Sequence, residues 1–73
     1  MKPKYSIGEN IYWLNVDEED VSIKFDKITA VHIYENIVIY DTHIRQNLNE
    51  RRVRSSAEAV AQILVDNFYN NLK

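Results

Sequence analysis

Arginines are the residues of this chain whose type and spacing most suggest chemistry with a partner. Four of them fall within residues 45–54, at Arg45, Arg51, Arg52 and Arg54. A guanidinium group presents its donors in a planar fork that matches phosphate and carboxylate oxygens. On a strand, Arg52 and Arg54 would share one face and Arg51 the other. The segment is therefore a candidate nucleic-acid site, with a solvated or internally paired basic stretch as the alternative.

An acidic run of opposite sign occupies residues 17–20, with the sequence Asp-Glu-Glu-Asp. Four adjacent carboxylates cannot be buried without partners, so we expect a solvated hairpin loop. The run lacks the ligand spacing and central glycine of an EF-hand calcium loop, which argues against a cation site. A protein partner is the better candidate ligand, together with tyrosines on the strands. The candidate protein-binding residues are Asp17, Glu18, Glu19, Asp20, Tyr12 and Tyr40.

The remaining constellations give little support to an enzyme. His32, Asp41 and His43 are ligand-type residues, but the strand register that we expect spreads them along a ribbon. The serines lack a Gly-x-Ser-x-Gly context, and a chain with one glycine and no cysteine has neither a Gly-rich phosphate loop nor a thiol nucleophile. We therefore expect a non-enzymatic protein without a cofactor or a metal ion.

The elements that must position these residues follow from a change of period at Ser55. Apolar residues alternate or cluster in β-branched runs over residues 10–53, as in half-buried strands. Ser55 and Glu58 fit a capping box at the start of a helix. The spacing predicts antiparallel strands within about residues 10–54 and one helix over about 56–71. The apolar residues that then recur at helical spacing are Val60, Ile63, Leu64, Phe68 and Leu72.

Within the predicted sheet, the first strand, residues 11–16, has apolar side chains on both faces, which suggests that both faces are covered. A bulge or bend at Asp26 and Lys27 would switch the inward face of the next strand. A two-residue turn at Glu35 and Asn36 would join it to the strand over residues 37–42. Residues 46–49 have the composition of a loop. Because one helix cannot cover every apolar face, barrel closure, a dimer or a protein partner must supply the rest.

The composition describes one small domain, residues 1–73, with a formal net charge of −2. The charge is uneven, with two lysines against five acidic residues in residues 1–20 and four arginines against one acidic residue in residues 43–54. Such asymmetry marks either two faces with different partners or one face that pairs internally. We find no signal peptide and no apolar stretch near the 20 residues that a membrane helix needs, so we expect a soluble, cytoplasmic protein.

Three short stretches carry a family resemblance: Ile-Gly-x-x-Ile-Tyr before the first strand, Lys-Ile-Thr-Ala-Val before a hairpin, and Val-x-Ser-x-Ala-Glu-Ala before the helix. Their order resembles that of small SH3-like β-barrel proteins of phage and bacterial genomes. The resemblance implies a binding module for protein or nucleic acid. We therefore predict an α+β fold of four to five antiparallel strands, forming a small SH3-like barrel or curled sheet with one C-terminal helix. The predicted function is a protein-interaction module, a small phage or mobile-element regulator or inhibitor of a host protein; a nucleic-acid-binding accessory protein is the alternative, and a homodimer remains open.

Overall fold

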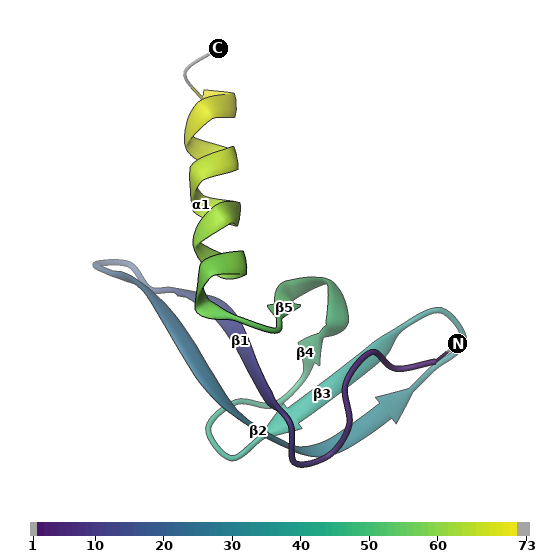
Figure 1. Ribbon diagram of the computed structural model, residues 1–73. Coiled ribbons are helices and arrows are strands. Elements are labelled where there is room, and N and C mark those ends of the chain that lie inside the picture. Colours follow the sequence, from purple (N-terminus) through teal and green to yellow (C-terminus); the bar gives the residue numbers. More distant parts are fainter. Residues whose placement is uncertain (1, 72–73) are drawn as a thin grey trace.

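The computed structural model describes the backbone of residues 2–71 and the side chains of residues 2–67 (Figure 1). All strand neighbours are antiparallel, and the sheet order is β4-β3-β2-β1-β5. The sheet curls into a half-barrel, and one helix follows it, which confirms the predicted α+β class. The elements are β1 (Asn10–Val16), β2 (Val21–Ile33), β3 (Val38–Thr42), β4 (Leu48–Asn49), the 3₁₀ turn η1 (Glu50–Arg52), β5 (Val53–Arg54) and α1 (Ala57–Asn71).

The curl of the sheet comes from β2, which is 13 residues long and changes partner along its length. Its first half pairs with β1 and its second half pairs with β3. The register shifts between Ile28 and Ala30, so the irregularity lies just after the predicted bend at Asp26 and Lys27. An extra residue on one strand increases local twist and bends the strand, which lets one long strand serve both halves of the sheet.

Both predicted hairpin turns are present. The β2–β3 turn closes through the Tyr34 amide, which donates to the Ile37 carbonyl at 2.8 Å around Glu35 and Asn36. The β1–β2 turn closes through the Asp17 amide and the Asp20 carbonyl, also at 2.8 Å. Residues 17–20 are all exposed, as expected for adjacent carboxylates that need water.

The concave side of the curled sheet holds the core. Ile11 and Trp13 of β1 point into it, and Trp13 is the largest of the fully buried side chains. Leu48 belongs to this core as well, so the segment predicted as a loop contributes β4 instead. A short strand of two residues carries too little pattern to be distinguished from a loop. The buried cluster consists of Ile11, Trp13, Ile28, Val38, Tyr40, Leu48 and Val53.

Helix α1 covers only part of the sheet. Its N-cap is Ser56, whose hydroxyl accepts from the Ala59 amide at 3.2 Å, so the cap lies one residue after the predicted Ser55. Val60 is completely buried against the sheet, whereas Leu64 is 39% exposed. The first turn lies beside β1 and β5, and the later turns extend beyond the sheet (Figure 1). The predicted contacts of Phe68 and Leu72 lie outside the described side chains.

The projecting helix gives the chain an elongated outline. The radius of gyration is 13.1 Å, against about 11 Å for a compact domain of this length. Among the described residues, no helix is long and apolar enough to cross a membrane.

Candidate interaction surface

The convex side of the β1–β2 hairpin carries a row of apolar side chains, which we call the outer face. Residues that are directly opposite in an antiparallel pair point to the same side of the sheet. Because Ile11 and Trp13 point into the core, their neighbours along β1 must point outward. The cross-strand pairs of the outer face are Tyr12 with Phe25, Leu14 with Ile23, and Val16 with Val21.

Much of the outer face is open. Phe25 is 61% exposed, Val16 is 65% exposed and Val21 is 48% exposed. The ring of Phe25 stacks on that of Tyr12 at a centroid distance of 5.4 Å and an interplanar angle of 27°, so each ring shields only one side of the other. The expectation that both faces of the first strand are covered is therefore correct only in part, because Tyr12 and Leu14 are half-buried whereas Val16 is exposed. Contiguous apolar surface of this kind typically marks a site of association.

The helix borders this face with further apolar side chains. Ile63, which lines a cavity together with Leu14 and Val16, is half-buried, and Leu64 is 39% exposed. Only the first turns of α1 pack on the sheet. The apolar stripe predicted for the helix therefore extends beyond the part that the sheet covers.

Three of the four candidate arginines gather at one edge of the outer face, around a cavity of about 250 Å³ that we call the arginine pocket. Residues 50–52 form a 3₁₀ turn rather than the predicted strand, so the side chains do not alternate between two faces. The guanidinium group of Arg54 donates to the carbonyls of Arg51 at 2.7 Å and Val53 at 2.9 Å, which fixes its position. The pocket is lined by Leu14, Val16, Arg51, Arg52, Arg54 and Ile63.

Arg45 does not belong to this pocket. It lies in the loop after β3, where its carbonyl accepts from the Thr42 amide at 2.7 Å. Its guanidinium group donates to the side chain of Asn15 at 3.4 Å. The structure therefore divides the basic segment into a pocket of three arginines and one separate arginine.

Within the described residues, neither the acidic loop, residues 17–20, nor the arginine pocket is neutralised by an ion pair. Over the part of the chain that the structure describes, the one contact between a basic and an acidic side chain within ion-pair distance joins His32 and Asp41, at 2.8 Å. The loop carboxylates bind locally: Asp20 accepts from the Val21 amide at 2.9 Å. Among the described residues, the loop and the pocket thus carry opposite charges that form no ion pair, and the internally paired alternative for the arginines is not what the structure has there.

Tyr40, proposed from the sequence as a surface residue, is completely buried. Its hydroxyl donates to Glu50 Oε2 at 2.6 Å and accepts from the Tyr5 amide at 3.2 Å. Burial and the hydrogen bond to Glu50 raise the pKa of Tyr40 to about 12, so it remains a donor over the whole accessible pH range. Tyr40 is therefore not available at the surface to bind a partner, and its hydroxyl instead holds the N-terminal segment to the core.

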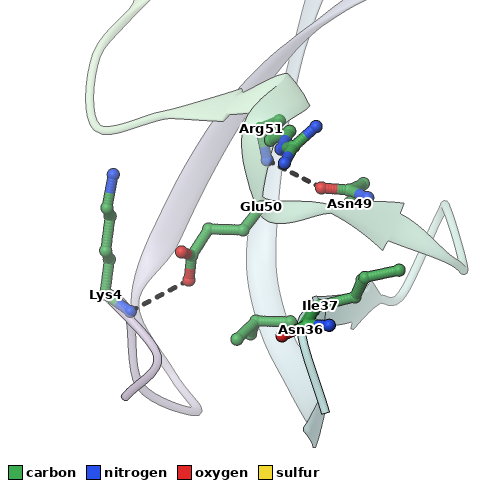
Figure 2. A pocket seen from close by; sticks show the side chains of 7 residues that line it. Lys4, Asn36, Ile37, Asn49, Glu50 and Arg51 are labelled. Atoms are coloured by element: carbon green, nitrogen blue, oxygen red, sulfur yellow. Dashed lines mark hydrogen bonds between the residues drawn. The ribbon is translucent and has the colours of Figure 1, made fainter. Parts of the chain in front are cut away.

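Glu50 is one of the residues that line a second cavity, of about 280 Å³ (Figure 2). Its Oε2 atom also accepts from the Lys4 amide at 3.1 Å, and the carboxylate points toward Lys4 in Figure 2. Burial raises the pKa of Glu50, but the hydrogen bonds from Tyr40 and Lys4 outweigh burial and leave that pKa below its ordinary value. The carboxylate is thus engaged in tying residues 4 and 5 to the core. The lining residues are Lys4, Asn36, Ile37, Val38, Asn49, Glu50 and Arg51.

The His32, Asp41 and His43 constellation is only partly brought together. The predicted register is confirmed, with His32 opposite Ile39 and Asp41 opposite Ala30. Asp41 accepts from the Asn47 amide at 3.0 Å as well as from His32, and these bonds lower the pKa of Asp41. Within the described residues, no group of three or more His, Cys, Asp or Glu side chains could hold a metal ion. The pair instead anchors the loop that follows β3.

No protein-family model, no curated protein and no solved structure matches this chain. The proposal on function therefore rests on the surface of the chain alone. Sequence reasoning named Tyr12 and the arginines but missed Phe25 and Val21 of β2, for which the available signal was their alternation along a strand opposite the apolar outer face of β1.

Proposed function

We propose that this chain is a non-enzymatic interaction module that binds a protein partner on the outer face of its β1–β2 hairpin. The observation that carries the proposal is the row of three cross-strand apolar pairs, of which Phe25 and Val16 are more than half exposed. Burying exposed apolar side chains is the main driving force of protein association. A small regulator or inhibitor that acts by covering a surface of another protein fits this arrangement.

Phe25 is the expected anchor of the interface. Aromatic side chains are enriched among the residues that dominate binding energy. The ring of Phe25 is already ordered in the free chain, because it stacks on the ring of Tyr12. A ring that is ordered before binding loses little conformational freedom in the complex. Truncating it should cost about 2 kcal/mol or more, which is about a thirty-fold loss of affinity.

Nucleic acid is the second candidate, because three arginines gather in one pocket. Two features make protein the better candidate. The pocket walls between the arginines are aliphatic, whereas single-stranded bases need aromatic surfaces on which to stack. The acidic loop follows directly after Val16, a pocket residue, and would repel a phosphate backbone.

The test is affinity capture from a lysate with three immobilised proteins: the unaltered chain, Phe25→Ser, and Ile44→Ser as a matched control. Ile44 is an exposed apolar residue of the loop after β3 and does not belong to the cross-strand pairs of the outer face. We expect one protein to be retained after nuclease treatment by the unaltered chain and by Ile44→Ser, and to be lost with Phe25→Ser. Equal retention by all three, with thermal unfolding showing that each is folded, would contradict the proposal. Material lost on nuclease treatment would favour the nucleic-acid alternative.

A further inference from the structure

We propose that the arginine pocket receives the acidic hairpin tip of a second copy of this chain, so that two copies form a symmetric dimer. The inference rests on the proposed function, because the contact uses one end of the same outer face. It goes further in naming the partner for that end. Four observations support it: the charges, the apolar neighbours of those charges, their relative placement and the surface area of the chain.

The charges of the two regions are complementary and are not paired with each other among the described residues. The pocket presents Arg51, Arg52 and Arg54, and the loop presents four exposed carboxylates. Over the described residues, none of these arginines lies within ion-pair distance of a carboxylate. Guanidinium groups bind carboxylates through two parallel hydrogen bonds, so an acidic segment is a ligand that this pocket can hold.

The apolar chemistry matches as well. The acidic loop is flanked by Val16 and Val21, which are 65% and 48% exposed. Leu14, Val16 and Ile63 supply the apolar wall of the pocket between the arginines. A ligand for this pocket should therefore combine carboxylates with adjoining aliphatic side chains. The hairpin tip of this chain has that composition.

The placement of the two regions allows a twofold arrangement. Val16 belongs to the lining of the arginine pocket and is also the last residue before the acidic loop. Pocket and loop thus lie on either side of Val16. A twofold axis that passes near Val16 brings the loop of each copy to the pocket of the other, so each contact occurs twice.

The exposed area of the chain is large enough for such an interface. The chain exposes 5598 Å², whereas a folded monomer of its mass, 8.7 kDa, typically exposes about 4,700 Å². The excess is therefore about 900 Å². A stable interface of ordinary size buries about 800 Å² on each partner. The exposed apolar side chains Val16, Val21 and Phe25 of the outer face belong to this surface.

The experiment is sedimentation equilibrium on the full chain over a range of concentrations and at two salt concentrations. We expect a mass of twice 8.7 kDa, with an affinity that falls as salt increases, because charges at the rim of an interface are screened. The charge of the pocket is reversed with Arg51→Glu plus Arg52→Glu, and the charge of the loop with Glu18→Lys plus Glu19→Lys. Each double substitution should weaken the dimerisation affinity roughly tenfold or more. Arg54 is left unchanged because its guanidinium group holds the backbone.

The decisive variant combines both reversals, since it restores opposite charges across the interface and should restore the dimer. Arg45→Glu is the matched control outside the pocket and should leave the mass unchanged. At a chain concentration of about 1 mM, even a weak dimer with a binding free energy of about −4 kcal/mol would be half-formed. A monomer mass at that concentration overturns the inference. A dimer that is insensitive to both reversals also overturns it. Neither result affects the capture test with Phe25→Ser, so failure of the dimer and failure of the proposed function remain distinguishable.

Discussion

The hydrogen bond between Tyr40 and Glu50 offers a sharp test of the interior of this fold. Tyr40→Phe removes one hydroxyl from a completely buried ring and leaves the packing of the ring in place. The change deprives the Glu50 carboxylate of its shortest hydrogen bond, 2.6 Å, and the Tyr5 amide of its acceptor. We expect the attachment of the N-terminal segment to the core to weaken.

The magnitude follows from the chemistry of the donor and the acceptor. A hydrogen bond to a charged group contributes about 1.5–3 kcal/mol to stability. Glu50 is half-buried rather than fully buried, so we take about 2 kcal/mol. For a chain of 73 residues, the entropy of unfolding is about 150 cal/mol/K, so the midpoint of thermal unfolding should fall by about 13 °C.

The pH dependence supplies a second readout. Because the hydrogen bonds to Glu50 hold its pKa below the ordinary value, its contribution is complete above the unfolded-state pKa of a glutamate. That contribution is lost as the pH falls through the lower pKa of the folded state. Tyr40→Phe removes one of the two donors, so the gap in unfolding temperature between variant and unaltered chain should narrow as the solution is acidified.

The assay is thermal unfolding followed by circular dichroism from neutral to acidic pH. Tyr5→Phe is the control, because the Tyr5 ring packs edge-on against Tyr40 at 5.7 Å while its hydroxyl makes no hydrogen bond within the described residues. We expect the control to unfold like the unaltered chain. A fall of less than about 4 °C for Tyr40→Phe, or a gap that stays constant with pH, would refute the reasoning.

Two further predictions concern the helix cap and the loop after β3. Ser56→Ala should lower the free energy of unfolding by about 1 kcal/mol, because the Ser56 hydroxyl caps the helix by accepting from the Ala59 amide. Ser55→Ala should have little effect. Chemical denaturation of both variants measures the difference, and a larger effect at Ser55 would contradict the observed cap. Asp41→Asn should flatten the acid dependence of stability, because the bond from the Asn47 amide lowers the pKa of Asp41, and stability is lost as the pH falls through that lowered value. Hydrogen exchange at the Asn47 amide should become faster in that variant, and unchanged exchange would show that the loop is held otherwise.

Much of the fold could be predicted from the sequence because it depends on local chemistry. The turn at Glu35 and Asn36 needs only residues that tolerate its backbone conformation, and the acidic run needs only water. The predicted helix, about residues 56–71, agrees with Ala57–Asn71 to within a residue. The cap itself was assigned one residue too early, at Ser55 instead of Ser56, because two adjacent serines satisfy the same sequence pattern equally well.

The candidate surface was less accessible from the sequence, because exposure depends on what lies across from a strand. Alternation placed Tyr12 and Trp13 of β1 on opposite faces, but it could not show which face the curled sheet encloses. The same limit explains Tyr40, whose polar tip suggested a surface position although Glu50, ten residues later in the chain, accepts its hydrogen bond in the interior.

The sequence by itself determined the three long strands and the helix, the two hairpin turns and the unequal distribution of charge, since each of these follows from the types and spacing of neighbouring residues. Only the tertiary structure decided that three of the four arginines share one pocket and that this pocket adjoins an open apolar face. That outcome depends on where β2 changes partner and on how few turns of α1 pack on the sheet. Both are set by contacts between residues that are distant in the chain, which a local pattern does not record.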